Sequence, residues 1–158
     1  MTPDQILDGL CDREGPGVPP YLDPHDAGGR TAWGISERAH PEAWQPGPPT
    51  REQARAIYAR LYVTPFDFVQ VAGCDDRLRV QLIDFGVNSG VSEAMTCLGR
   101  VLDEQWETLT ADRARHINNE LLAERFVLEH RLTQTRPPDK RFEDGWDTRV
   151  ASFYWGPM

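Results

Sequence analysis

Residues 13–36 read REGPGVPPYLDPHDAGGRTAWGIS, and the rest of the chain is organised around this stretch. It places one carboxylate, Glu14, just after a short segment whose apolar residues Ile6, Leu7 and Leu10 have helical spacing. The stretch continues as a loop rich in glycine, proline and aspartate. A long loop of this kind inside a compact domain is usually functional. We therefore expect a site here, with Glu14 at its edge.

Glu14 has the position expected of a general acid. The spacing predicts a helix over residues 3–13, which puts Glu14 at its C-terminal end. A carboxylate there meets the negative end of the helix dipole, and burial beside Tyr21 or Trp33 would add a desolvation cost. Both effects favour the protonated carboxyl that a general acid needs near neutral pH. The alternative interpretation is a solvated glutamate paired with Arg13.

Further helices are predicted from capping residues and from apolar residues at helical spacing. Their expected extents are residues 50–64, 75 or 76 to 88, 92–102, 110–136 and a last segment with Phe142, Trp146 and Val150 on one face. The helix that ends at residue 88 is apolar on more than one side, which is typical of a buried central helix. Residues 15–49 predict only a short helical turn near residues 36–39.

Asp84 is a charged residue within the predicted central helix. A buried charge is costly unless it is paired, so we expect a partner such as an arginine or loop amides. Structural pairing and catalysis are both open interpretations of this aspartate.

Composition excludes several classes of function. The net charge of -8 argues against a nucleic-acid partner, and it also gives no long-range attraction to an anionic wall polymer. We expect Arg51, Arg55 and Arg60 to offset that repulsion locally. The cysteines and histidines lack metal-ligand spacing, so no metal or cofactor is expected. No run is long enough for membrane insertion, and the N-terminus has no signal-peptide pattern.

The organising stretch also contains an ordered set of acidic, glycine, threonine and other residues. Its members are Glu14, Gly15, Tyr21, Asp23, Pro24, Asp26, Gly28, Gly29, Thr31, Gly34 and Ile35. This set resembles the opening motif of the glycoside hydrolase family 108 muramidases, Glu-Gly-Gly-Tyr followed by Asp-Pro-x-Asp-x-Gly-Gly-x-Thr-x-x-Gly-Ile. One departure is that the first part of the motif is broken: Glu14-Gly15-Pro16-Gly17 and a Pro19-Pro20 pair come before Tyr21, which makes this loop longer and stiffer than in the family.

Three further segments carry the resemblance through most of the chain. They are REQARAIYARLYVTP at 51–65, LIDFGVNSG at 82–90 and RFEDGWDTRV at 141–150. The last resembles a block that the family labels as a peptidoglycan-binding region. Residues 103–110 depart from the family, because DEQWETLT stands where an Asp-Gly-x-x-Gly-Pro-x-Thr turn is common.

The resemblance implies a small all-α, lysozyme-like single domain of about six helices with a long N-terminal active-site loop. Residues 1–102 would form the catalytic part, and residues 110–158 a helical, peptidoglycan-binding-like part. Glu14 would be the catalytic acid, with Asp23, Asp26 and Thr31 as candidates for the second catalytic role. The expected substrate-binding residues are Tyr21, Trp33, Tyr62, Asn88 and Trp146.

The activity implied is cleavage of peptidoglycan glycan strands at the β-1,4 bond between N-acetylmuramic acid and N-acetylglucosamine. Without a signal peptide, the chain is expected to be made in a bacterial host cytoplasm as a phage or prophage lysozyme. It would reach the periplasm or cell wall as an endolysin, or on a particle in contact with phage tail or baseplate proteins. Two other classes stay open: a non-catalytic wall-binding module and a lytic transglycosylase.

Overall fold

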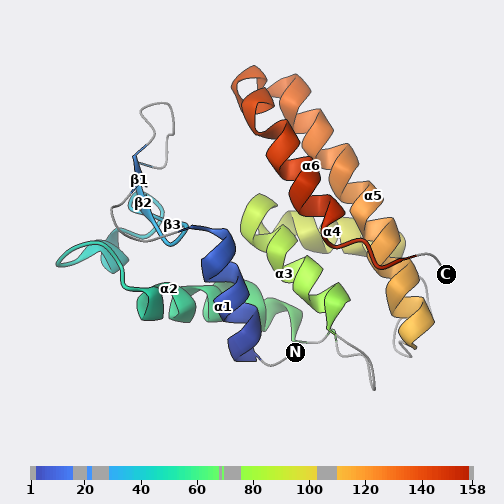
Figure 1. Ribbon diagram of the computed structural model, residues 1–158, viewed down its shortest axis with the longest axis horizontal. Coiled ribbons are helices and arrows are strands. Elements are labelled where there is room, and N and C mark those ends of the chain that lie inside the picture. Colours follow the sequence, from blue (N-terminus) through green and yellow to red (C-terminus); the bar gives the residue numbers. More distant parts are fainter. Residues whose placement is uncertain are drawn as a thin grey trace. The chain divides into compact units, whose positions relative to one another are not determined.

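The chain forms two compact units, Met1–Pro65 and Phe66–Met158, in a computed structural model (Figure 1). The structure describes residues 3–15, 21–22, 29–67, 69, 76–102 and 110–156. The division into a catalytic part at 1–102 and a helical part at 110–158 stays a prediction.

The first unit is built on two helices, α1 (Pro3–Arg13) and α2 (Arg51–Tyr58), which pack together. The buried residues of α1 are Ile6, Leu7, Leu10 and Cys11, and those of α2 are Ala54, Ile57 and Tyr58. Both helices were predicted, and Thr50 and Gln53 form the expected capping box. The α-helical part is shorter than predicted, because Ala59–Val63 continues α2 as a π-helix.

A small antiparallel sheet occupies part of the glycine-rich segment, where the sequence predicted only a helical turn. Its strands are β1 (Tyr21–Leu22), β2 (Arg30–Ala32) and β3 (Ile35–Ser36), in the order β1-β2-β3. The register pairs Thr31 with Tyr21 on one side and with Ser36 on the other. The segment continues into a 3-10 helix, η1 (Pro41–Trp44), whose Trp44 ring is buried and lies 4.9 Å from the Arg30 guanidinium.

The second unit contains α3 (Arg77–Ser89), α4 (Val91–Val101), α5 (Ala111–Thr135) and α6 (Glu143–Ala151), with η4 (Pro137–Phe142) before α6. In Figure 1, α6 runs alongside α5, and these two helices pack together. The Thr110 hydroxyl accepts from the Arg113 N–H at 3.2 Å, as a cap of α5 should. Residues 78 and 80–86 of α3 are all buried, which confirms a central helix.

Asp84 is fully buried in α3 and has two arginine partners. Arg149 of α6 holds it in a bidentate pair, with Nε 3.0 Å from Oδ2 and Nη2 2.8 Å from Oδ1. The Arg125 Nη2 of α5 lies 2.9 Å from Oδ2, and the guanidinium lies over the Phe85 ring. Asp84 therefore ties the central helix to both α5 and α6, and its expected pairing is confirmed.

The described helices confirm an all-α domain, because the only strands in the described ranges are the three short ones of the first unit. Cys11 and Cys97 are buried free thiols. None of the described helices has both the length and the apolar character needed to cross a membrane.

Replacing Asp84 by asparagine should be strongly destabilising. The substitution keeps the side-chain shape but removes the buried charge that pairs with Arg125 and Arg149, a loss of about 3–5 kcal/mol in the free energy of unfolding. Urea unfolding followed by circular dichroism measures this. As a control, Glu124→Gln removes the exposed Arg100–Glu124 pair and should change stability little. Equal small effects of both substitutions would contradict the structural role of Asp84.

Candidate active site

Glu14 lies directly after α1 and is half-buried. Its backbone N–H donates to the carbonyl oxygen of Leu10 over 3.0 Å, which continues the helical hydrogen bonding by one residue. Gly15 follows with a φ of 85°, a left-handed conformation that ends helices and favours glycine. The main chain of Glu14 is thus fixed by the end of the helix.

A tight hairpin between β2 and β3 comes next to this helix end. Ala32 pairs with Ile35, so the turn consists of Trp33 and Gly34 alone. Their φ values of 53° and 74° are the two positive angles of a type I′ turn. The conformation suits Gly34 but costs about 1 to 2 kcal/mol at Trp33, because its Cβ crowds the backbone. Such strain persists only where the surroundings hold it in place.

The tip of the hairpin contacts Glu14 directly. A methyl group on Gly34 would lie 2.8 Å from Cβ and 3.0 Å from Cγ of Glu14, and it would overlap the hydroxyl of Tyr58. Tyr58 is only 2% exposed, and its hydroxyl donates to the carbonyl oxygen of Trp33 over 2.7 Å. Glu14, the Trp33–Gly34 turn and Tyr58 therefore form one packed cluster.

Tyr62 extends this cluster. Its ring lies 5.9 Å from that of Tyr58, centroid to centroid, with the planes tilted by 51°. Burial raises the pKa of the Tyr62 phenol, and the nearby negative charge of Glu14 raises it further. The hydroxyl therefore stays protonated through neutral pH, as a hydrogen-bond donor close to the glutamate.

A ladder of ion pairs joins α1 to α2. Aspartates recur every fourth residue on α1, and Arg51 and Arg55 of α2 contact them. The bonds are Arg51 to Asp8 at 2.5 Å and to Asp12 at 3.0 Å, and Arg55 to Asp4 at 2.6 Å and to Asp8. Arg51 also lies 6.0 Å from the centre of the Trp33 ring. Arg51 thus contacts both the helix that carries Glu14 and the strained turn.

Comparison with known proteins gives the family of the chain. A family model described as Glycosyl hydrolase 108 matches residues 8–90, which include Glu14, the hairpin and both tyrosines. The chain belongs to the glycosyl hydrolase 108 family. It is therefore a glycoside hydrolase of the muramidase type, and its substrate is peptidoglycan.

A solved structure of similar fold is "Structure of Brucella abortus SagA". It aligns with a TM-score of 0.70 at 22% identity and covers 96% of this chain and 91% of that one. This likeness shows a shared fold. No match was found among the curated proteins.

The structure places only some of the predicted site residues of this glycosyl hydrolase 108 chain in the cluster around the hairpin tip. Glu14, Trp33 and Tyr62 belong to the cluster around the hairpin tip. Thr31 is half-buried in β2, paired through its backbone with Tyr21 of β1. Asp23 and Asp26 lie outside the described residues.

The other two predicted residues belong to the second unit. Asn88 is exposed near the end of α3, with its Nδ2 3.5 Å from Oε1 of Glu129. Trp146 of α6 is half-buried and stacks on Phe142, with ring centroids 6.0 Å apart.

Sequence reasoning missed the task of Arg51 and Arg55. They were expected to attract an anionic polymer, but both are already paired with aspartates of α1. The expected local offset of the negative charge is therefore wrong for these two arginines. The four-residue spacing of Asp4, Asp8 and Asp12 was the signal that could have revealed the ladder.

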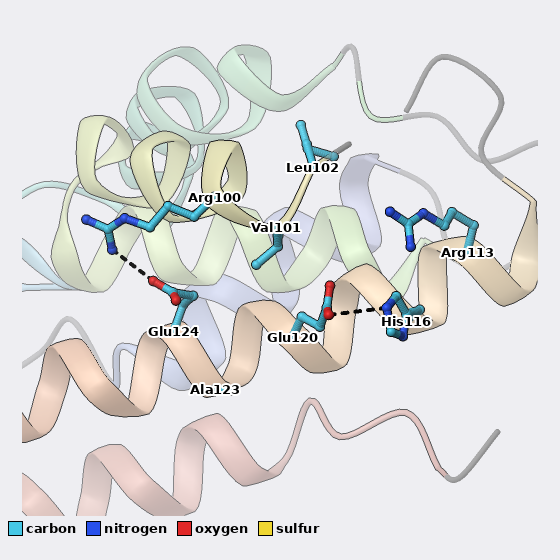
Figure 2. A pocket seen from close by; sticks show the side chains of 8 residues that line it. All are labelled: Arg100, Val101, Leu102, Arg113, His116, Glu120, Ala123 and Glu124. Atoms are coloured by element: carbon cyan, nitrogen blue, oxygen red, sulfur yellow. Dashed lines mark hydrogen bonds and ion pairs between the residues drawn. The ribbon is translucent and has the colours of Figure 1, made fainter. Parts of the chain in front are cut away.

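A separate groove of about 550 Å³ lies on the second unit, between α4 and the first half of α5 (Figure 2). Its acids already have side-chain partners: Glu120 lies 3.2 Å from the His116 Nε2, and Glu124 pairs with Arg100 at 2.8 Å. It contains none of the predicted site residues, so we do not assign the chemistry to it.

The ion-pair ladder should make the first unit sensitive to acid. Hydrogen bonds from Arg51, with Arg55 nearby, lower the pKa of Asp8 below its ordinary value. Its stabilising effect is therefore complete above the unfolded pKa of about 4 and is lost as pH falls through the lower folded value. We expect Asp8→Asn to be less stable than the parent at pH 7, with a smaller difference at pH 3.

Urea unfolding of both proteins at the two pH values measures this difference. Molar salt at pH 7 should also reduce it, because exposed charges are screened. A difference that does not change with pH would contradict an electrostatic role for Asp8.

Proposed function

We propose that this muramidase hydrolyses the β-1,4 bond between N-acetylmuramic acid and N-acetylglucosamine, with Glu14 as the general acid. The observation that carries the proposal is the half-buried Glu14, packed through Cβ and Cγ against the hairpin tip and close to the Tyr62 phenol. Immobilisation of a catalytic group in this way is what general acid catalysis requires, because proton transfer depends on distance and direction.

In the proposed reaction, Glu14 transfers its proton to the glycosidic oxygen as the bond to the sugar C1 breaks. The oxygen leaves as the hydroxyl of the departing sugar, and positive charge develops at C1. Water completes the reaction and supplies the new hydroxyl at C1. Tyr62 would donate a hydrogen bond to the bound strand, and Trp33 would offer an aromatic face to a sugar ring.

The second catalytic group is proposed from Asp23, Asp26 and Thr31. A carboxylate about 5 Å from Glu14 would act as a nucleophile and retain the configuration, and one at about 6.5–9.5 Å would activate water and invert it. Thr31 could instead hold the water. Tyr21 and Asn88 are further proposed contacts to the strand.

Replacing Glu14 by glutamine should lower the rate of glycan cleavage by about 10²- to 10⁴-fold, because the amide cannot give up a proton to the leaving oxygen. The measurement is mass spectrometry of soluble fragments released from purified peptidoglycan. We expect fragments with reducing muramic acid ends from the parent and from Glu52→Gln, an exposed control on α2.

The same experiment separates the alternatives. Anhydro ends would assign a lytic transglycosylase, which also uses one glutamate but does not add water. Full activity of Glu14→Gln would refute the proposed acid. No fragments from the parent, under conditions where a control lysozyme works, would favour a non-catalytic wall-binding module.

A wall-binding function of the second unit is favoured by one observation, the stacked pair of Phe142 and Trp146. Phe142 is 41% exposed, and the Arg141 guanidinium lies 4.5 Å from its ring centre. Aromatic faces that stay accessible can pack against the apolar faces of sugars.

We expect Trp146→Ala to weaken binding to insoluble peptidoglycan by about tenfold or more, the effect of removing an aromatic anchor. Cosedimentation with purified walls measures it. The control is Val127→Ala, which shortens another exposed apolar residue on α5. Equal binding of both variants would contradict a role for Trp146.

Delivery by a phage, as an endolysin or on a tail structure, is the finer proposal that the family resemblance suggests. Proteomics of purified particles and of the soluble lysate distinguishes the two routes, and a source without any phage genes would refute both.

A further inference from the structure

We infer that Tyr58 is a positioning residue for Glu14, and that it acts through the Trp33–Gly34 turn. The inference rests on the proposed role of Glu14 as the acid. Tyr58 is not expected to contact the substrate. It holds the hairpin tip in place, and the tip in turn packs against Glu14.

The first step is the hydrogen bond to the turn. The Tyr58 hydroxyl donates to the carbonyl oxygen of Trp33 over 2.7 Å, from a side chain that is 2% exposed. A part-buried carbonyl that lost this donor would be left without its hydrogen bond or would have to move to find another donor. Trp33 has a φ of 53°, a backbone conformation that is unfavourable for a residue with a large side chain. The Tyr58 hydroxyl therefore selects the observed turn.

The second step is the contact between the turn and the acid. The Gly34 backbone approaches both the Tyr58 hydroxyl and the Cβ and Cγ of Glu14 so closely that no side chain fits at this position. Any rotation of the Trp33–Gly34 peptide therefore changes the surface on which the Glu14 side chain rests. Displacement of a catalytic group by about 1 Å is enough to slow a reaction severely.

The test compares two substrates whose leaving groups differ in their need for a proton. A defect in acid catalysis slows only the substrate whose leaving group must be protonated. One substrate is soluble uncrosslinked glycan strands, whose leaving sugar must be protonated. The other is a dinitrophenyl β-glycoside of the GlcNAc–MurNAc disaccharide, whose phenolate leaves without a proton. We expect Tyr58→Phe to lower kcat on the strands about tenfold with little change in KM, and to lower the rate on the aryl glycoside less than about twofold.

The ratio of the two rates within one variant does not depend on how much of the protein is folded. Tyr58→Phe keeps the buried ring, and a Gly34→Ala variant, which presses a methyl group against Glu14, should shift the ratio in the same direction. Tyr154→Phe removes an exposed hydroxyl in the second unit and is the control, with the parent ratio.

Equal losses on both substrates, or full activity of Tyr58→Phe on the strands, would overturn the inference. Glu14→Gln distinguishes this failure from failure of the proposed function. If Glu14→Gln is inactive on strands and Tyr58→Phe is not impaired, only the role of Tyr58 is refuted. If Glu14→Gln is fully active, the proposed acid itself is wrong.

Discussion

The close approach of the Gly34 backbone to Glu14 and Tyr58 is the constraint on which the site depends. An added methyl group would lie 2.8 Å from the Glu14 Cβ, so the hairpin can reach the end of α1 only with glycine at its tip. The left-handed conformation of Trp33 follows from the same constraint, because a two-residue turn with the twist of a hairpin needs positive φ at both positions. The strain at Trp33 is then offset by the hydrogen bond from Tyr58 and by the Arg51 guanidinium near its ring.

The two units use charge in different ways. In the first, the aspartates of α1 and the arginines of α2 pair at a partly exposed surface, where water and salt weaken each bond. In the second, Asp84 and Arg125 are wholly buried, where an unpaired charge is far more costly. The ladder therefore aligns α1 and α2, and the loss of one of its pairs should lower stability only a little. The packing of α3, α5 and α6 instead depends on Asp84 and on both of its arginine partners.

Local sequence patterns predicted the helices well, but they could not predict contacts between residues far apart in the chain. Thr50 with Gln53, and Thr110, mark helix starts because a cap needs only residues within one turn. The cost of burying Asp84 predicted a partner such as an arginine or loop amides, but not that the partners would be Arg125 and Arg149, which are 41 and 65 residues away. The sheet was missed because strands of two or three residues are too short to show an alternating pattern.

The candidate site shows the same division. Glu14 was predicted as the acid from its position after a helix and from a family motif, both of which are readable along the chain, and its catalytic role stays a prediction. The task of Gly34 could not be derived in this way, because it concerns which side chains the turn meets, and Tyr58 lies 25 residues from the carbonyl it binds. A motif lists the residues that a site needs, and only the fold shows which of them touch.

The contact between the hairpin and Glu14 has a property that suits an acid. The turn meets the Cβ and Cγ of the side chain, which carry no charge and do not change when the carboxyl gains or loses a proton. A group held only by ion pairs would lose its anchor each time it became neutral, and its geometry would vary through the catalytic cycle. Packing of the carbon stem keeps the direction of the side chain the same in both protonation states. If Glu14 is the proposed acid, it can then give up its proton and recover it in one geometry, which repeated turnover requires.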